Sequence, residues 1–333
     1  MEIRRQTVGI TAGHAGQPPT QVDAYTMDTG ADLAVTVWTY GASLVEVQVP
    51  DRDGVVDNVV LRLPELASYE SRRSNPYLGS VMGRFCRAVR DGRFRLDGVE
   101  HELATNEAGQ HIHGGPLGFD RYVWTADAAR DGDELQLRLR LDSPDGAQGY
   151  PGAVTAECRY RVSGDGTLVF DYRATTTAST IVSLTNHAFW NLSRASTVDD
   201  HVLAVRADRA VVFDDDFVPQ AGPPPPVANS GLDHRRARQL GGAALDNCFV
   251  LDDATGPAAE LTDPATGRVM SVHTDQPTLG VYTGDHYAAL PRGGICLTAG
   301  AMPDAPNRPA YPSARLDPGG LYRQRTVHRF GVC

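Results

Sequence analysis

The histidine of a polar and aromatic segment is the first candidate for chemistry. His187 lies in Ser-Leu-Thr-Asn-His-Ala-Phe-Trp-Asn-Leu-Ser, residues 183–193. An imidazole titrates near neutral pH, so it can donate or accept a proton there. Asn186 can help to fix the tautomer of the ring, and Trp190 can offer an apolar face to a sugar ring. Because a histidine among aromatic residues is also common in protein cores, the segment alone leaves both interpretations open.

A second candidate is the pair His111 and His113, which Gly114 and Gly115 follow. Glycines allow a ligand to approach the backbone closely. On a strand, residues two apart face the same way, so both imidazoles would share one side. His-x-His is also a spacing of metal ligands. No acidic or thiol groups cluster nearby in sequence, so we expect no metal site. A purely structural role stays open for this pair.

Other polar residues stand at the ends of apolar segments. Asp246 comes directly before an apolar strand, Asp285 and His286 follow a Tyr-Thr-Gly turn, and Thr298 ends the run Gly-Ile-Cys-Leu-Thr. A carboxylate at the mouth of a strand can accept hydrogen bonds from sugar hydroxyls. The alternative for Asp246 is a turn aspartate that caps its own backbone. We expect the histidines and these residues to converge on one sugar-sized pocket.

The elements that must position these residues are predicted to be strands. Alternation of apolar and polar residues, with many β-branched and aromatic side chains, indicates strands along the chain. The Asp97-Gly98 pair suits a type I′ turn between two of them. The predicted strands cover residues 33–40, 44–49, 59–63, 93–96, 99–103, 134–141, 168–174, 180–184, 202–205, 210–213 and 280–283.

Helical patterns are weak. Only residues 64–72 and 233–240 could form short helices, because no window keeps a 3.6-residue period with caps at both ends. With 34 glycines and 22 prolines among many short strands, the chain is predicted to be all-β. We expect residues 1–333 to form a single domain. The four-proline run at 223–226 is expected to be a surface loop within it.

Composition excludes several classes of function. The net charge is −10, so the chain has no basic surface of the kind that binds nucleic acid. All 31 basic residues are arginines, which excludes lysine Schiff-base chemistry and a P-loop lysine. The five cysteines are far apart, which favours reduced thiols and a cytoplasmic protein over disulfides. No signal peptide and no membrane span are predicted.

Together these motifs resemble the aldose 1-epimerase (galactose mutarotase) family over roughly residues 30–330. The matching motifs occur in the family's order along the chain. They are Tyr-Gly-Ala at 40–42, Val-Pro-Asp-Arg-Asp-Gly at 49–54, Leu-Gly-Ser at 78–80, Gly-Arg-Phe at 83–85, Asp-Gly-Arg-Phe at 91–94, His-Gly-Gly-Pro-Leu-Gly-Phe-Asp at 113–120, Ser-Pro-Asp-Gly at 143–146, Gly-Tyr-Pro-Gly at 149–152, Thr-Asn-His at 185–187, Tyr-Thr-Gly at 282–284, Pro-Asp-Ala at 303–305 and Leu-Asp-Pro-Gly at 316–319.

The resemblance implies a large antiparallel β-sandwich and a mechanism. A mutarotase opens a cyclic hemiacetal and recloses it on the other face, and it needs no cofactor because only protons move. By resemblance, His187 is the general acid, His113 assists at the ring oxygen, and Asp246 binds hydroxyls. We also expect substrate binding by residues within or beside the matching motifs: Arg84, Asn186, Trp190, Asp285, His286 and Thr298.

Two positions depart from the family pattern. The family's general base is a glutamate, and Thr298 stands at that place. Threonine does not ionise in the useful range, and loss of a positioned base typically costs about 10² to 10⁴ in rate. The family's sugar-binding arginine is replaced by Ala88, and Arg87, one residue away, should face the other way on a strand. Asp285 or His286 could supply the missing proton acceptor.

The sequence therefore predicts an acid/base isomerase that acts on a sugar or another cyclic hemiacetal-like compound. The missing base suggests specialisation, for example on a metabolite of a biosynthetic pathway. A different proton transfer, such as an elimination or a ring rearrangement, would use the same two histidines. The alternative from another class is a carbohydrate-binding or sensor protein without catalysis. We expect a monomer or homodimer whose partner is a small molecule, with neither nucleic acid nor membrane involved.

Overall fold

The computed structural model describes residues 1–14, 17–30, 32–214, 216–252 and 255–333. Within these residues, antiparallel strands dominate and the single α-helix is α1 (Leu66–Glu70). This confirms the all-β prediction. Short turns of 3-10 helix are η1 (Arg90–Gly92), η2 (Phe119–Arg121), η3 (Ala147–Gly149) and η4 (Ala305–Asn307). No helix in the described part of the chain has the length and apolar character to cross a bilayer.

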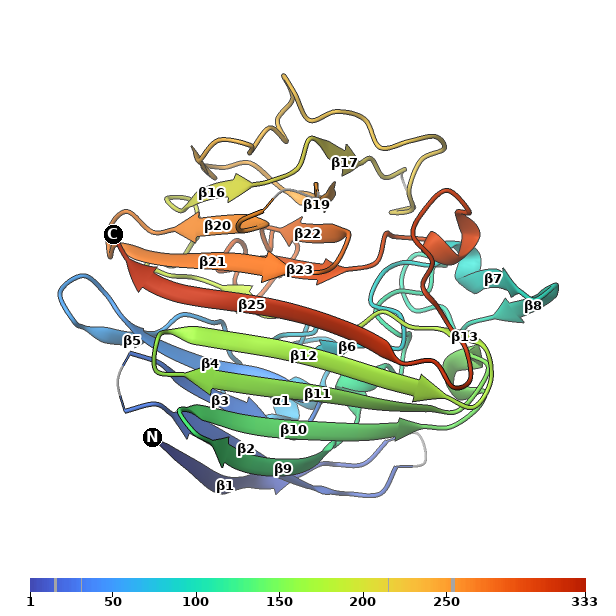
Figure 1. Cartoon of the computed structure of the whole chain (residues 1–333), viewed down its shortest axis with the longest axis horizontal. Coiled ribbons are helices and arrows are strands. Elements are labelled where there is room, and N and C mark those ends of the chain that lie inside the picture. Colours follow the sequence, from blue (N-terminus) through green and yellow to red (C-terminus); the bar gives the residue numbers. More distant parts are fainter. Residues whose placement is uncertain (15–16, 31, 215, 253–254) are drawn as a thin grey trace.

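The largest sheet has nine strands, and its long central strands lie side by side across the front of Figure 1. In spatial order they are β18 (Arg238–Gln239), β16 (Val202–Val205), β20 (Ala259–Thr262), β21 (Arg268–Thr274), β25 (Tyr322–Val332), β12 (Thr167–Thr176), β11 (Val154–Ser163), β10 (Glu134–Ser143) and β9 (Thr125–Asp131).

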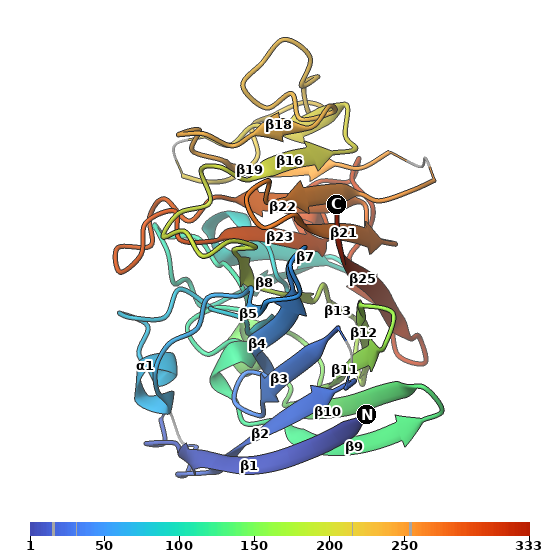
Figure 2. The same cartoon turned by 90° about the vertical axis from the view of Figure 1, so that its left-hand side faces the viewer.

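Two five-stranded sheets accompany it. The first runs β1 (Glu2–Ile10), β2 (Gln21–Asp28), β3 (Ala34–Trp38), β4 (Ser43–Pro50) and β5 (Val56–Asn58). The second runs β15 (Phe189–Trp190), β23 (Ile295–Gly300), β22 (Thr278–Tyr282), β19 (Asp246–Val250) and β17 (Arg209–Val211). In Figure 2 the first begins at the bottom of the molecule with β1, and the strands β19, β22 and β23 of the second lie in the upper half, below β18 and β16.

Three two-stranded pairs complete the regular structure. They are β13 (Thr180–Ile181) with β24 (Arg315–Leu316), β14 (Thr185–Asn186) with β6 (Val81–Met82), and β7 (Arg93–Leu96) with β8 (Val99–Glu102). The β7–β8 connection is the predicted Asp-Gly turn. Asp97 and Gly98 both have positive φ, 51° and 79°, which a type I′ turn requires.

Side-chain alternation explains why the sheets pack as a sandwich. In β10, Leu135, Leu137 and Leu139 are fully buried, whereas Arg138 and Arg140, which alternate with the leucines, are exposed. Leu137 lies opposite Tyr160 of β11, whose hydroxyl donates to the carbonyl of Ala42 at 2.6 Å. That bond joins the nine-stranded sheet to the turn between β3 and β4, across one continuous apolar core.

Most predicted elements exist, with shifted ends, and two are wrong. The helix predicted at 64–72 is α1, but residues 233–240 form turns and the short strand β18. Residues 59–63 contain only an isolated bridge between Val60 and Trp190. The proline run at 223–226 lies in a largely exposed loop, as expected. The five cysteines are free thiols, as their spacing predicted.

Candidate active site

A cavity of about 530 Å³ opens over the second five-stranded sheet. Its floor comes from β19, β22 and β23, and its walls come from loops that carry residues 76–77, 87–88, 107–108, 110, 112–113, 213 and 216–217. This volume is typical of small-molecule sites. Aromatic side chains on several walls provide apolar surface to a ligand: Tyr77, Phe213, Phe217, Tyr282 and Tyr287.

His113 reaches the cavity from a sharply bent loop. His113 has a φ of 55°, and Gly114 and Gly115 also have positive φ. A Cβ at Gly114 would lie 1.8 Å from the carbonyl oxygen of Gly83, so only glycine fits there. The His113 Nδ1 lies 2.7 Å from the carbonyl oxygen of Cys86 and must donate to it. The Nε2 atom is therefore the acceptor nitrogen of the neutral ring.

The bent loop also separates the two histidines of the His-x-His motif. The expectation that both face one side is wrong, because residues 111–113 do not form a regular strand. His111 is fully buried, with Nδ1 2.7 Å from the Ala104 carbonyl oxygen and Nε2 2.6 Å from the Tyr150 hydroxyl. Both its nitrogens are occupied by protein groups, so His111 is structural. The described residues contain no cluster of potential metal ligands.

His187 lies between β14 and β15, and backbone hydrogen bonds hold it firmly. Its amide donates to the Ser80 carbonyl at 2.9 Å, and its carbonyl accepts from the Gly79 amide at 3.0 Å. The ring stands edge-on to that of His113, with 5.0 Å between centroids and 80° between planes. Both side chains line the cavity. The structure thus brings together the two histidines that the sequence singled out.

Burial makes both of these imidazoles weak bases. Desolvation, assisted by the nearby Arg87 charge, lowers the pKa of His187 to about 4. Desolvation also lowers the pKa of His113 well below its usual value, and the neighbouring His187 and Arg87 add to this effect. Both rings are therefore neutral at pH 7, each with one donor and one acceptor nitrogen, and the donor of His113 is already committed to the Cys86 carbonyl.

Asp246 supplies a carboxylate to the same cavity. It is the first residue of β19, opposite Tyr282 of β22, and solvent reaches it from within the cavity. Desolvation by the surrounding walls raises the pKa of Asp246 to about 6. His286 and Arg87 lower this pKa, whereas Glu107 raises it further. A carboxyl group with such a value can exchange protons near neutral pH.

Thr298 lies on the cavity floor in β23, paired with Gly280 of β22. Its hydroxyl accepts a hydrogen bond from Arg87 Nη1 at 3.0 Å and donates to the Gly280 carbonyl at 3.5 Å. The sequence analysis expected Arg87 to face away, and this is wrong. Residues 83–89 follow β6 as an irregular segment, so the alternation of a strand does not apply, and Arg87 lines the cavity.

Of the two proposed substitutes for the missing base, only His286 lines the cavity. Its ring stacks near that of Tyr282, with 6.4 Å between centroids, and its amide donates to the Tyr282 hydroxyl at 2.9 Å. Asp285 points elsewhere, because its carboxylate is held by the Thr283 hydroxyl and by Arg292 at 2.7 Å. Although burial opposes ionisation of Asp285, these two hydrogen bonds lower its pKa overall.

Three further residues expected at the site lie outside the cavity. Arg84 is buried, and its guanidinium donates to Ser143 and to the carbonyls of Pro144 and Gly152, which fixes the loop after β10. The Asn186 amide donates to the carbonyl of Gly79 and, at 3.1 Å, to the Tyr160 hydroxyl. Trp190 packs in the core against His328 and Phe330.

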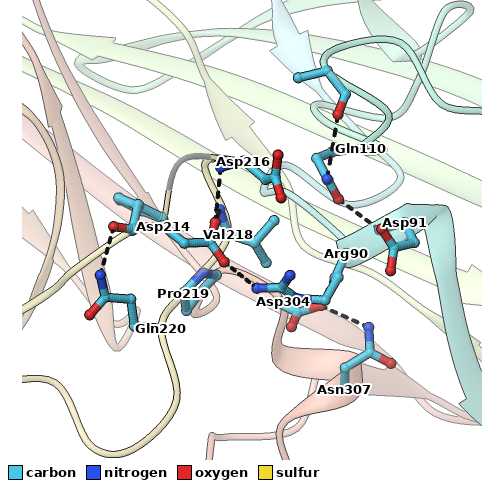
Figure 3. A network of polar contacts seen from close by, with 12 residues as sticks. Arg90, Asp91, Gln110, Asp214, Asp216, Val218, Pro219, Gln220, Asp304 and Asn307 are labelled. Carbon is cyan, nitrogen blue, oxygen red and sulfur yellow. Dashed lines mark hydrogen bonds and ion pairs between the residues drawn. The ribbon is translucent and has the colours of Figure 1, made fainter.

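One wall of the cavity is a loop that sequence reasoning missed. The loop carries Phe213, Asp216 and Phe217, which all line the cavity, and Phe217 is 51% exposed. Asp214 shapes the loop by accepting from the amides of Asp216 and Val218, both at 3.1 Å (Figure 3). The acidic run at 214–216 is the only sequence signal, and it suggests no more than a turn.

One ion pair and two hydrogen bonds to backbone carbonyls fasten this loop to the rest of the site. Arg90 donates to Asp214 at 2.5 Å, and Figure 3 shows Arg90 between Asp214 and the Asp304–Asn307 turn. On the other side, Arg308 donates to the carbonyls of Pro219 and Gln220. The loop is thereby tied to the segment that follows Arg87 and to the turn that follows β23.

Comparison with known proteins agrees with this geometry. The sequence profile described as aldose 1-epimerase matches residues 23–329. Galactose mutarotase from Rattus norvegicus is 33% identical to this chain over 321 residues, which cover 90% of the chain and 92% of that protein. Aldose 1-epimerase from Escherichia coli is 29% identical over 331 residues, which cover 92% of the chain and 94% of that protein.

Solved structures show the same fold. A galactose 1-epimerase from Lactobacillus acidophilus superimposes with a TM-score of 0.86 at 25% identity, and the match covers 99% of both chains. An aldose epimerase homologue from C. elegans gives a TM-score of 0.85 at 25% identity, with 92% of this chain and 98% of that chain covered. These matches confirm the predicted β-sandwich.

Proposed function

Because the chain belongs to the aldose 1-epimerase family, we propose that it catalyses proton transfer on a sugar or other cyclic hemiacetal bound in this cavity. The observation that carries the proposal is the meeting of His187, His113 and Asp246 in one cavity. Their pKa values are moved in opposite directions, down for the imidazoles and up for the carboxyl group. The shifts reverse the usual order, so the carboxyl group holds its proton more tightly than the His187 imidazole does, and pKa values perturbed in this way are typical of acid/base sites.

The pKa values assign the roles in ring opening. Between a pKa of about 4 for His187 and about 6 for Asp246, the imidazole is neutral and the carboxyl group is protonated. His187 accepts the proton of the anomeric hydroxyl, the bond from the anomeric carbon to the ring oxygen breaks, and its electron pair goes to that oxygen. Asp246 delivers a proton to the same oxygen. The free aldehyde rotates, and the reverse steps close the ring as the other anomer.

His113 holds the substrate during this exchange. Its Nδ1–H is committed to the Cys86 carbonyl, so Nε2 presents an acceptor to a substrate hydroxyl. The low pKa of the ring keeps this acceptor unprotonated at neutral pH. By resemblance, the base would be a glutamate and the acid would be His187. Because Thr298 stands at the place of the glutamate, His187 acts as the base in this proposal and Asp246 acts as the acid.

Thr298 also favours a second class of function. The cavity floor carries a threonine that is hydrogen-bonded to Arg87 in place of an ionisable base. Such a cavity could bind a carbohydrate without transforming it, as a sensor or binding protein does. A different proton transfer, an elimination or ring rearrangement, would use the same groups. Binding without turnover of any hemiacetal, in wild-type protein, would favour the binding protein.

Polarimetry tests the catalytic proposal with freshly dissolved α-glucose and α-galactose. The wild-type protein should accelerate the approach to anomeric equilibrium, and His187→Ala should abolish most of that acceleration. His101→Ala is the matched control, because His101 lies in the β7–β8 hairpin and does not line the cavity. Acceleration that survives in His187→Ala would contradict the assignment of His187.

A further inference from the structure

Arg87 is a buried cation without a counterion. Its side chain is only 9% exposed, although it lines the cavity. Among the ion pairs of the described residues, none involves Arg87. The carboxylates of Asp120, Asp285 and Asp304 pair with other arginines. A buried charge without a partner is costly, because it loses its hydration without gaining an opposite charge.

Neutral groups hold Arg87 in place and leave part of its fork unused. Nη1 donates to the Thr298 hydroxyl at 3.0 Å, Nη2 to the Thr298 carbonyl at 2.6 Å, and Nε to the Ala301 carbonyl at 3.3 Å. A guanidinium has five N–H groups. Three are used, so one N–H on each terminal nitrogen has no protein acceptor among the described residues. Because both Thr298 acceptors lie on one edge of the planar guanidinium, the two unused N–H groups point along its other edges, and each can donate to a separate ligand oxygen.

The floor of the cavity is shaped to accommodate this guanidinium. Gly280 lies beneath it, and a Cβ there would stand 2.5 Å from Arg87 Nη1 and 2.6 Å from the Thr298 hydroxyl oxygen. The backbone of Gly280 does not have a positive φ, so local conformation does not demand glycine. Glycine is instead required at position 280 because any side chain would occupy the space of the Arg87 guanidinium. Gly280, Arg87 and Thr298 therefore act together as one donor surface on the floor.

The other charged groups of the cavity are arranged unequally around Arg87. His113 and His187 are neutral, so neither offers it a negative charge. Asp246 is close enough for Arg87 to lower its pKa, but the two form no ion pair. Glu107 and Asp216 are exposed residues on the walls. These walls disfavour a simple anion, so an anionic group must enter as part of a larger ligand that also contacts the walls.

We infer that Arg87 forms an anion subsite, so that the substrate is a cyclic hemiacetal or hemiketal bearing a carboxylate. The cyclic hemiacetal or hemiketal part of this inference rests on the proposed function, whereas the negative charge of the substrate is inferred from Arg87 alone. One oxygen of the carboxylate accepts from a free N–H group of the guanidinium, and the other free N–H group is available to a second oxygen of the same ligand. Thr298 keeps the guanidinium in place through its hydroxyl and its carbonyl.

Calorimetric titration compares a neutral sugar with two charged ones. Galactose is neutral, whereas galacturonate and N-acetylneuraminate carry a carboxylate on a carbon bonded to the ring oxygen, one on either side of it. We expect at least one of the charged sugars to bind wild-type protein about tenfold or more tightly than galactose, because a charged hydrogen-bonded pair typically contributes that much. Arg87→Gln should remove the preference. The control Arg95→Gln changes an exposed arginine of the β7–β8 hairpin and should preserve it.

Gly280→Ala provides a second variant that keeps the charge. The added Cβ displaces the guanidinium, so the preference for the carboxylate should also fall in this variant. Equal affinities for all three sugars in wild-type protein, or failure of both charged sugars to bind, would overturn the inference. So would a preference that persists in Arg87→Gln. Binding is measured without turnover, so the subsite can stand even if His187→Ala shows that the proposed proton transfer is wrong, and the reverse also holds.

Discussion

The imidazole rings of His113 and His187 stand edge to face, 5.0 Å apart, although 73 residues separate them in the chain. The His113 ring is held by its hydrogen bond to the Cys86 carbonyl, and the backbone of His187 is held by the hydrogen bond from its amide to the Ser80 carbonyl. Segments that flank β6 thus position both. Such support from regular backbone contacts is what a site needs for a fixed geometry.

Replacement of the carboxyl group tests the partner of His187. Asp246→Asn keeps the shape and loses the exchangeable proton. We expect the rate of anomer exchange, measured by NMR magnetisation transfer, to fall by about 10² to 10⁴, the usual contribution of a positioned acid or base. Asp252→Asn, near the distal end of the same sheet, serves as the control. An unchanged rate in Asp246→Asn would remove Asp246 from the mechanism.

Restoring a carboxylate at the floor tests the consequence of Thr298. In Thr298→Glu, the new carboxylate would pair with Arg87, which already contacts residue 298. We therefore expect no gain in galactose mutarotation from this single change. The double variant Arg87→Asn, Thr298→Glu frees the carboxylate and should gain activity, up to about 10² to 10⁴. Polarimetry measures both, and equal rates in the single and double variants would argue against the blocking role of Arg87.

The structural histidine makes a separate prediction about stability. Tyr150 is buried, and its hydroxyl donates to His111 Nε2 because His111 Nδ1 donates to the Ala104 carbonyl. Tyr150→Phe leaves a buried nitrogen without a donor, which should lower the free energy of unfolding by about 1–3 kcal/mol. Urea unfolding measures this. Tyr311→Phe, on a half-buried ring, is the control and should change stability less; equal effects would contradict the role of the bond.

The loop over the cavity makes a prediction about substrate affinity. Arg90→Ala removes the hydrogen bond to Asp214 that fastens the loop bearing Phe213 and Phe217. Both partners are about one-third exposed, so the effect on overall stability should be small. We expect KM to rise several-fold while kcat changes little, because the loop forms a wall without supplying a proton. A fall in kcat at constant KM would contradict this assignment.

The sequence predicted the fold well because its signals are local and repeated. Strict alternation in β10 places leucines on one face, and the Asp97-Gly98 turn dictates its own conformation. The helix predicted at 233–240 failed because polar residues there follow no apolar stripe, and hydrogen bonds to neighbouring strands decide the outcome. Residues 59–63 have the composition of a strand but find only one bridging partner.

Sequence motifs located several of the residues that line the cavity and failed for residues whose direction depends on tertiary contacts. His187, His113, Asp246, His286 and Thr298 line the cavity, as expected. Arg87 was assigned the wrong direction, because a strand's two-residue period was applied to a segment that is not a strand. Arg84 is hydrogen-bonded to the Ser143 carbonyl and Asp285 to Arg292, so both side chains are held away from the cavity. These partners are distant in sequence for Arg84 and depend on tertiary structure for both. No local pattern indicates that the loop at 213–217 reaches the cavity.

The dependence of the anomer-exchange rate on pH tests the central claim most directly. If His187 must be neutral and Asp246 protonated, kcat/KM should be highest between about pH 4 and pH 6. Above the pKa of Asp246, kcat/KM should fall tenfold per pH unit, because the carboxyl group loses its proton. Below the pKa of His187, kcat/KM should also fall, because the imidazole ring gains a proton. Asp246→Asn should lose the alkaline limb. A rate that rises with pH through this range, or an alkaline limb that persists in Asp246→Asn, would contradict the account.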